Sequence, residues 1–186
     1  MILLASKSPR RKQLFEENIG LEYLTYTPQI DEHASDYLKD PISIVRDISL
    51  RKANSIPSDY KDYIVITADT IVVYNNEIIG KPKDELDAKN TLRKLSNNTH
   101  EVITAFTIKK GNQIITNHVI SYVTFYDLKD ELISAYVASK SPLDKAGAYG
   151  IQDGDKFKIV KEYKGSYTNI VGFPIDEIKQ TLKLFI

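Results

Sequence analysis

The feature that most constrains the fold is a run of β-branched and other apolar residues with an acidic residue inside it. Residues 64–68 have the composition of a core strand, which we expect to be interrupted at Asp69-Thr70 and resumed over residues 71–73. Burying an ionised carboxylate costs free energy unless a cation or a metal ion lies beside it. Asp69 is therefore either a functional group lining a cleft, or part of a bulge or exposed strand end with a structural role.

Strand-like and helix-like segments alternate along the rest of the chain, which predicts an α/β fold. Further strands are expected at residues 2–4, within 21–30, and as a hairpin formed by 102–108 and 114–125. Asn75-Asn76 can form a turn that leads back into residues 78–79. Helices are expected from Pro9 to near Gly20, over 41–56, from Asp84, over 128–138 and from Pro174, and the last should bury Ile175, Ile178, Leu182 and Phe185. No repeat or linker is apparent, so we expect a single domain over residues 1–186.

Composition excludes several classes of function. The chain has 25 basic and 25 acidic residues, so no bulk charge favours a nucleic acid or an anionic membrane. It contains no cysteine, which excludes disulfides, a thiolate nucleophile and sulfur-ligated metals. No apolar run approaches the roughly 20 residues that span a bilayer, and the apolar N-terminus is too short for a signal peptide. We expect a cytoplasmic protein that binds neither nucleic acid nor membrane.

The junction between the first expected strand and helix collects hydroxyls and cations. Its sequence is Ala5-Ser6-Lys7-Ser8-Pro9-Arg10-Arg11, with Ser8 as the expected N-cap. The N–H groups and the dipole at a helix N-terminus favour an anion, and guanidinium groups bind phosphate oxygens in pairs. The segment is compatible with polyphosphate binding. The structural alternative is an N-capped helix with solvated basic residues.

Two later loops combine small residues with polar groups. Lys81-Pro82 follows Gly80, and the loop before residue 150 carries Asp144 and Lys145, with Gln152 just after it. Glycine and alanine let a backbone approach a ligand closely, and the polar side chains could contact it. The alternative interpretation is a surface loop that leads into a strand.

The three histidines, His33, His100 and His118, are far apart and form no i, i+4 pair. A histidine metal site or a histidine-centred triad is therefore disfavoured. Any metal ion must be held by oxygen ligands.

Seven sequence blocks, in the same order and spacing, resemble the Maf family of nucleotide pyrophosphatases. They are A-S-K-S-P-R-R from Ala5, D-E from Asp31, R-K-A from Arg51, A-D-T from Ala68, G-K-P from Gly80, D-K-A-G-A-Y-G-I-Q from Asp144 and N-I-V-G-F-P from Asn169. The resemblance implies a bent mixed β-sheet flanked by helices, with two lobes around a central cleft. It also implies hydrolysis of a nucleoside triphosphate to the monophosphate and pyrophosphate.

The resemblance implies a role for each matching residue. Asp69 would be the general base that accepts a proton, and Glu32 would join it near a divalent metal ion, Mg²⁺ or Mn²⁺. Phosphate-binding positions would be Ser6, Arg10, Arg11, Lys52 and Lys81. The family's dTTP and UTP subgroup is similar to this chain at three specificity positions, which are Arg10, Thr70 and Gln152. Asp144 and Lys145 are further cleft candidates.

Gln152 offers a physical reason for that specificity. Uracil and thymine present an N3–H donor beside an O4 acceptor, which one amide can satisfy with its oxygen and its NH₂ group. A flipped amide would serve cytosine equally well, so Gln152 discriminates only if its orientation is fixed by a neighbour such as Arg10 or Thr70. We expect UTP and dTTP to be preferred, CTP to follow and purines to come last.

Two residues depart from the family pattern: Ser141 stands where the family usually has glutamate, and Asn97 where glycine is usual. The first removes a carboxylate near the expected cleft, and the second should affect only a helix end. The tyrosine-rich strands make a homodimer plausible. The alternative function is a nucleotide-binding regulator of cell division without significant turnover.

Overall fold

The computed structural model describes residues 1–35 and 38–186 of the chain. It separates into two compact units. Unit 1 comprises Met1–Thr70, Thr104–Val119 and Tyr167–Ile186, and unit 2 comprises Ile71–Ile103 and Ile120–Ser166.

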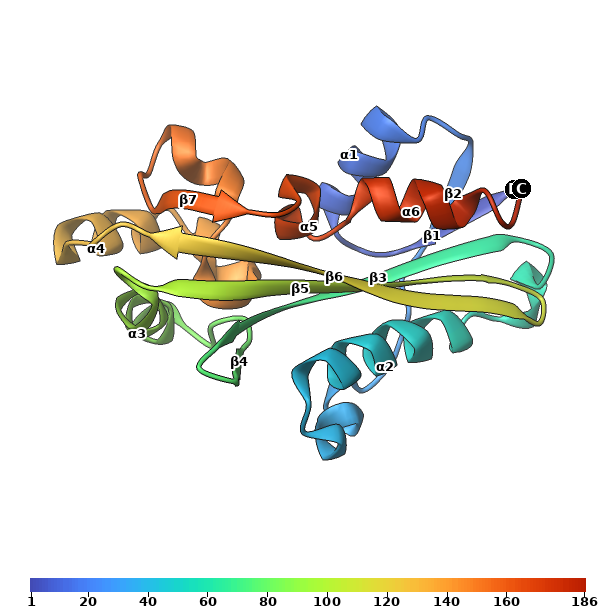
Figure 1. Cartoon of the computed structure of the whole chain (residues 1–186), viewed down its shortest axis with the longest axis horizontal. Coiled ribbons are helices and arrows are strands. Elements are labelled where there is room, and N and C mark those ends of the chain that lie inside the picture. Colours follow the sequence, from blue (N-terminus) through green and yellow to red (C-terminus); the bar gives the residue numbers. More distant parts are fainter. The chain divides into compact units, whose positions relative to one another are not determined.

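The strands form a mixed sheet, as the sequence predicted. They are β1 (Ile2–Ala5), β2 (Tyr23–Tyr26), β3 (Ile64–Tyr74), β4 (Glu77–Ile79), β5 (Thr99–Lys110), β6 (Gln113–Phe125) and β7 (Val160–Lys164). Their order is β2-β1-β3-β5-β6-β7, and β4 pairs with β3 (Figure 1). The pairs of β1 with β2 and β3 are parallel, whereas β3–β4 and β6–β7 are antiparallel.

In the residues that the structure describes, six α-helices flank this sheet, so the α/β class is confirmed. They are α1 (Pro9–Asn18), α2 (Pro41–Asn54), α3 (Glu85–Leu95), α4 (Asp130–Ala138), α5 (Tyr167–Val171) and α6 (Ile175–Leu182). Short 3₁₀ turns are η1 (Glu32–Leu38), η2 (Ser58–Tyr60), η3 (Ser141–Asp144), η4 (Ala146–Ala148) and η5 (Ile151–Asp155). In the described part of the chain, every helix is too short or too polar to span a bilayer.

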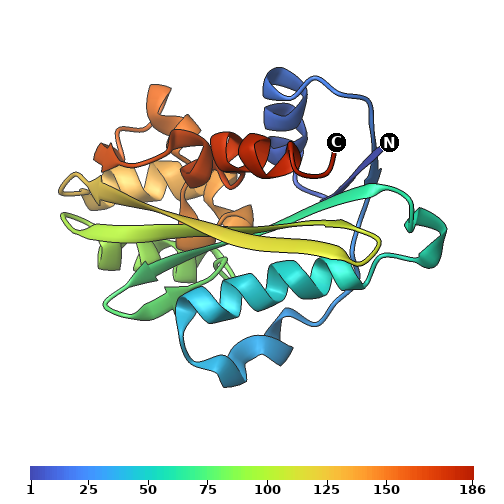
Figure 2. The ribbon, with the colours of Figure 1, turned by 45° about the vertical axis from the view of Figure 1, so that its right-hand side comes forward.

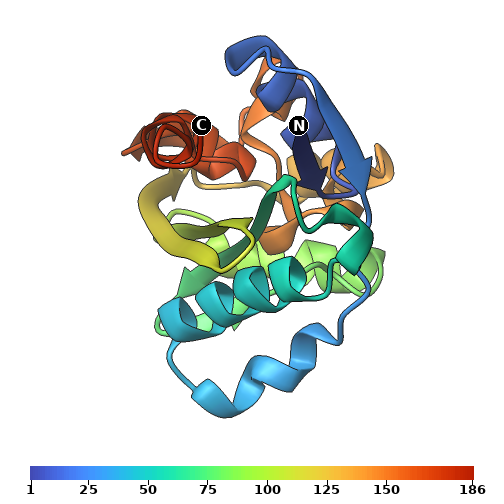
Figure 3. The same ribbon diagram turned by 90° about the vertical axis from the view of Figure 1, so that its right-hand side faces the viewer.

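In unit 1, the alternation of side chains along β1 divides the core into two clusters. Ile2 and Leu4 join a cluster with Phe15 of α1 and with the apolar face of α6. Leu3 and Ala5 point to the other face and pack in a second cluster with Val65 and several tyrosines. The helices α1 and α6 accordingly lie on one face of the strands of this unit and α2 on the other (Figures 1 and 3).

The C-terminal helix closes the first cluster of unit 1. The sequence predicted that it would bury Ile175, Ile178, Leu182 and Phe185, and each of these side chains is buried. The spacing of these residues matches one face of a helix. Both ends of the chain lie side by side in this unit (Figure 2).

One sequence expectation is wrong: β3 is not interrupted at Asp69-Thr70 but runs from Ile64 to Tyr74 as one strand. The physical reason is a cation at the acidic side chain. Lys52 Nζ lies 2.7 Å from Asp69 Oδ1, so the carboxylate is compensated where it stands and the strand need not break.

Unit 2 contains two local signals that the sequence identified correctly. Asn75 and Asn76 adopt positive φ values of 51° and 61° in the turn between β3 and β4. Asp84 caps α3 by accepting a hydrogen bond of 2.8 Å from the backbone N–H of Asp87. Asn97 follows α3 with φ of 57°, a conformation that asparagine tolerates, so this departure affects only the helix end as expected.

Three elements differ from the sequence expectations. Strand β2 covers only Tyr23–Tyr26, and β7 and the five-residue α5 were not predicted. Four of the five residues of β7 are exposed, because this strand only pairs with β6 along one edge. Such a strand has no buried face and therefore no alternating apolar pattern.

A buried histidine in unit 2 should make the stability depend on pH. His100 is 2% exposed, its Nε2 lies 2.8 Å from the Tyr149 hydroxyl, and burial lowers the pKa of His100 to about 4. Between pH 6.5 and 4 the unfolded chain binds a proton that the folded chain does not. Acidification through this window should therefore lower the free energy of unfolding by about 3 kcal/mol at this residue.

Urea unfolding at pH 7 and pH 4 measures this effect. His100→Gln retains a polar group for Tyr149 but does not titrate, so the variant should lose less stability on acidification than the wild-type chain. An equal loss in both proteins would contradict the prediction.

Candidate active site

In unit 1, the loop after β1 carries the first expected phosphate residues. Ser6 is buried, and its hydroxyl accepts a hydrogen bond of 3.2 Å from the Ser8 backbone N–H. Ser8 is the N-cap of α1 and Pro9 occupies its first turn, as the sequence predicted. Within the described residues the Ser8 side chain makes no capping hydrogen bond. The Ser8 hydroxyl and the first N–H groups of α1 can thus serve an anion.

Arg11, one turn into α1, binds three other segments of unit 1. Its Nε donates to the Gly172 carbonyl at 2.8 Å, and its Nη1 donates to the Ala68 carbonyl at 2.9 Å. Its Nη1 also reaches Ser6 Oγ at 3.5 Å, and its Nη2 donates to Thr70 Oγ1 at 3.0 Å. These contacts use four of the five N–H groups of a guanidinium. Arg11 therefore fastens α1 to β3 on both sides of Asp69.

Replacing Arg11 should destabilise the fold. Arg11→Ala leaves the buried carbonyls of Ala68 and Gly172 without this donor, so we expect the free energy of unfolding to fall by about 2–4 kcal/mol in urea titrations. Lys7→Ala, which removes an exposed cation from the same loop, is the matched control and should change it by less than about 0.5 kcal/mol. Equal stability of the two variants would show that the guanidinium contacts contribute nothing.

Two carboxylates of unit 1, those of Glu32 and Asp69, form ion pairs with the same lysine. Lys52, in the last turn of α2, places Nζ 2.7 Å from Asp69 Oδ1 and 2.8 Å from Glu32 Oε1. The Lys52 and Asp69 side chains are each 13% exposed, whereas the Glu32 side chain is 55% exposed. The three residues that the sequence assigned to base, phosphate and metal roles are therefore direct neighbours.

Burial sets the proton affinity of the acidic residue in this cluster. Loss of solvent raises the pKa of Asp69, and the attraction of Lys52 and then of Arg11 opposes that rise. Burial also lowers the pKa of Arg11, which the attraction of Asp69 opposes. A carboxylate of raised pKa is a stronger base than an exposed one, which suits proton abstraction.

The segment that carries Glu32 is held by a residue to which the sequence assigned no role. Arg51 Nη2 donates to the Asp31 carbonyl at 2.7 Å, and its Nη1 donates to Ser35 Oγ at 2.8 Å. Ser35 in turn donates to Asp47 Oδ2 at 2.7 Å. The i, i+4 spacing of Asp47 and Arg51 on α2 predicts their own ion pair, but no sequence signal indicates the contacts of Arg51 with Asp31 and Ser35.

Thr70, the expected specificity residue of unit 1, is held among fixed partners. Its Oγ1 lies 3.0 Å from Thr104 Oγ1 and accepts from Arg11. Gly172 has φ of 111°, and a Cβ atom there would lie only 3.1 Å from Thr70 Oγ1. Glycine at position 172 thus lets the backbone approach Thr70 closely.

The donor set of unit 1 is compatible with a divalent metal ion. Asp69 and Glu32 bring carboxylate oxygens to the same lysine, and hard oxygen ligands suit Mg²⁺ and Mn²⁺. Among the described residues, no group of three or more carboxylates or histidines forms a complete metal cage. Mg²⁺ is commonly held by one or two carboxylates together with substrate phosphates, and this arrangement provides two.

In unit 2, the two loops identified from the sequence lie together. The Gly147 N–H donates to the Gly80 carbonyl at 3.1 Å, next to Lys81. Gly147 has φ of 70°, and a Cβ atom there would lie 2.9 Å from Val72 Cγ2, so this position requires glycine. The side chains of Lys81 and Gln152 are exposed.

Lys145 is enclosed by its own loop in unit 2. Its Nζ donates to the Ser141 carbonyl at 2.5 Å, to Ser141 Oγ at 3.1 Å and to Asp144 Oδ1 at 2.8 Å. Asp144 and Lys145, the further candidates from the sequence, are therefore an ion pair. Arg10 belongs to α1 of unit 1, as Arg11 does.

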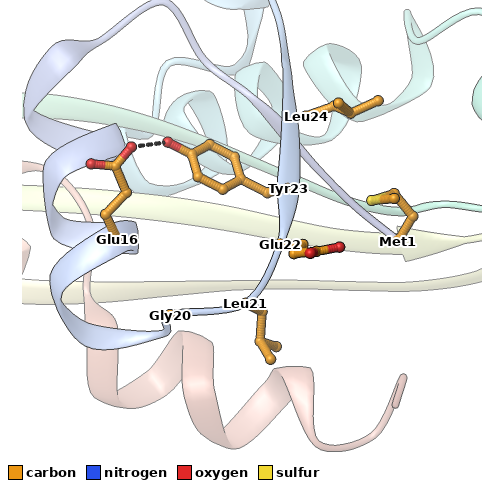
Figure 4. Close-up of a pocket in the computed structure, with 7 residues that line it drawn as sticks. All are labelled: Met1, Glu16, Gly20, Leu21, Glu22, Tyr23 and Leu24. Atoms are coloured by element: carbon orange, nitrogen blue, oxygen red, sulfur yellow. Dashed lines mark hydrogen bonds between the residues drawn. The ribbon is translucent and has the colours of Figure 1, made fainter.

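A surface pocket in unit 1 contains none of the predicted site residues. It is lined by Met1, Glu16, Gly20, Leu21, Glu22, Tyr23 and Leu24 (Figure 4). The Tyr23 hydroxyl donates to Glu16 Oε1 at 2.5 Å, which raises the pKa of Tyr23 to about 12. The lining is acidic and apolar without a basic residue, so it does not suit a polyphosphate.

Comparison with known proteins agrees with the sequence blocks. The family model described as Maf-like protein matches residues 1–185. A relative from Bacillus thuringiensis subsp. konkukian (strain 97-27) is 44% identical over 184 residues, which cover 99% of this chain and 95% of the relative. Relatives from Bacillus cereus (strain AH820) and Bacillus anthracis are 43% and 42% identical with the same coverage. All three are named dTTP/UTP pyrophosphatase. The chain therefore belongs to the Maf family.

Proposed function

We propose that this chain is a nucleoside triphosphate pyrophosphatase that hydrolyses dTTP and UTP to the monophosphate and pyrophosphate. The observation that carries the proposal is the buried carboxylate of Asp69, held 2.7 Å from Lys52 in a continuous strand. A site that only bound a polyphosphate would favour cations alone, whereas hydrolysis needs a base for the attacking water. The name shared by the Bacillus relatives supports the same reaction.

In this mechanism Asp69 orients a water molecule and accepts its proton. The raised pKa of Asp69 makes the carboxylate a better base, while the attraction of Lys52 opposes that rise and favours the ionised form. The water attacks phosphorus, and the anhydride bond between the α- and β-phosphates breaks. Pyrophosphate leaves and the nucleoside monophosphate remains.

We infer phosphate-binding roles for the residues that match the family's phosphate positions. Ser6, Arg10 and Arg11 lie at or near the N-terminal end of α1, and Lys52 and Lys81 provide point charges. Donors that are already in place stabilise the charge that develops on the phosphate oxygens. Arg11 would contribute its remaining N–H group, since four are used within unit 1.

Glu32 and Asp69 would hold Mg²⁺ or Mn²⁺ together with substrate oxygens. When bound, such an ion neutralises phosphate charge and polarises the phosphoryl group. Lys52 pairs with both carboxylates but balances only one of their two negative charges.

Base preference would follow from Arg10, Thr70 and Gln152. An amide at position 152 can satisfy the N3–H and O4 groups of uracil and thymine, so UTP and dTTP should be used best and purines least. We further propose that residues 1–186 are a single domain, and that Asp144 and Lys145 of unit 2 take part in substrate binding. The cytoplasmic location and the homodimer remain predictions from the sequence.

The decisive experiment is to identify the phosphorus product from a panel of dTTP, UTP, CTP, GTP and 7-methyl-GTP. Release of pyrophosphate with the highest kcat/KM for dTTP and UTP is expected. Release of orthophosphate would contradict the cleavage position. Tight nucleotide binding without any turnover would favour the alternative, a nucleotide-binding regulator.

A further inference from the structure

In unit 2, one buried hydroxyl holds the chain on both sides of Gln152. The Tyr136 hydroxyl accepts a hydrogen bond of 2.9 Å from the Gly150 N–H and donates one of 2.6 Å to Asp153 Oδ2. The Asp153 N–H also donates to the Gly150 carbonyl at 3.0 Å. The short segment between residues 150 and 153, which contains Gln152, is thereby closed into a fixed turn.

The anchor of this turn is rigid. Tyr136 lies in α4 with no exposed surface, and its ring packs against Phe157 with centroids 4.9 Å apart. Burial and the hydrogen bond to Asp153 raise the pKa of Tyr136, so the hydroxyl keeps its proton and remains a donor. A buried aromatic side chain in a helix has few conformations available, which fixes the position of the atoms that it holds.

A second donor connects the same carboxylate to the loop of Lys145. Ser141 Oγ donates to Asp153 Oδ2 at 2.7 Å and accepts from Lys145 Nζ at 3.1 Å. A glutamate at position 141, as the family pattern would have it, would place a second negative charge beside Asp153. Serine at position 141 and aspartate at position 153 are therefore chemically matched in this chain.

Gln152 itself has little to fix its orientation. Its side chain is exposed, and among the described residues its amide makes no hydrogen bond. An amide that can turn over would serve cytosine as well as uracil. The backbone turn on which Gln152 stands fixes the place and the direction from which its amide is presented to a base.

We propose that Asp153 is a positioning residue for Gln152, and that its contacts with Tyr136 and Ser141 set the preference for a 4-oxo pyrimidine over cytosine. The inference rests on the proposed pyrophosphatase function and adds a specificity determinant to it. Asp153 acts through the Gln152 turn and does not itself contact the base.

The test compares kcat/KM for UTP and CTP in wild type and in Asp153→Ala. We expect the UTP to CTP ratio to fall about 5- to 20-fold, mainly through a higher KM for UTP, because hydrogen bonds to a charged partner are lost. Asp155→Ala is the matched control, since it removes an exposed carboxylate from the same turn, η5. The ratio should stay within about twofold in this control.

Further variants separate positioning from general damage. Asp153→Asn retains an acceptor oxygen and should restore most of the ratio. Tyr136→Phe keeps the buried ring but removes the hydroxyl, so it should lower the ratio like Asp153→Ala even if that variant folds poorly. In a Gln152→Ala background, Asp153→Ala should leave the ratio unchanged, because the two residues act on one step.

The outcomes distinguish this inference from the function on which it rests. The inference alone is overturned if wild type releases pyrophosphate but Asp153→Ala and Tyr136→Phe both keep the wild-type ratio of kcat/KM for UTP to kcat/KM for CTP. If Asp153→Ala lowers kcat/KM for UTP and for CTP by the same factor, the role of Asp153 is purely structural and the inference is also overturned. A wild-type chain that releases no pyrophosphate from any nucleotide overturns the proposed function and this inference with it.

Discussion

Asp69→Asn should lower kcat for pyrophosphate release by about 10²–10⁴-fold while leaving the fold intact. The amide has the shape of the carboxylate, but it neither accepts a proton from water nor balances the charge of Lys52. Steady-state release of pyrophosphate measures the effect, and thermal unfolding monitors the fold. Asp62→Asn, at an exposed position shortly before β3, is the matched control and should retain wild-type activity. Activity of Asp69→Asn within a few-fold of wild type would remove Asp69 from the mechanism.

The pH profile gives an independent check on the same residue. Burial raises the pKa of Asp69, so the ionised base should be lost at a higher pH than an ordinary carboxylate as the solution is acidified. Lys52→Met removes the cation that opposes this rise, so the acid limb of kcat/KM should move further towards neutral pH. If Lys52 served only to bind phosphate, Lys52→Met would lower kcat/KM without moving the acid limb of its pH profile.

Removal of divalent metal ions should abolish turnover, a loss of at least about 10²-fold, and addition of Mg²⁺ or Mn²⁺ should restore it. The physical reason is that a triphosphate and two carboxylates bring more negative charge than Lys52 balances. Treatment with EDTA followed by dialysis and metal titration measures the effect. Glu32→Gln should raise the metal concentration needed for half-maximal rate. Full turnover in rigorously metal-free buffer would contradict a metal role.

Local signals made much of the fold predictable. Asn75-Asn76 specify a turn with positive φ at both residues, and Asp84 specifies a helix start, because each effect involves only neighbouring residues. Strand β7 and helix α5 escaped prediction since one is exposed along most of its length and the other is only five residues long. The conformation of a short helix, or of a strand that is polar on both faces, depends more on its tertiary contacts than on its own sequence pattern.

The sequence named candidate site residues but gave few of their contacts. The position of Asp69 inside an apolar run indicated a cation nearby, and Lys52 is that cation. Nothing in the sequence indicated that Arg11 would donate to the carbonyl of Gly172, 161 residues away. Backbone carbonyls belong to every residue, so their partners are set by the fold and leave no mark in composition or spacing. The hydroxyl of Tyr136 beside Gln152 is hidden for the same reason, since a tyrosine in an apolar helix face indicates only core packing.

The continuity of β3 constrains how this protein can change its length during evolution. Asp69 stands inside a paired strand, and side chains on a strand alternate between its two faces. A single inserted or deleted residue between Ile64 and Ala68 would turn Asp69 to the opposite face and put Ala68 or Thr70 beside Lys52. A base carried on a loop could survive such a change by local adjustment. In this protein, viable insertions should therefore fall outside β3, in surface turns such as the one between β5 and β6.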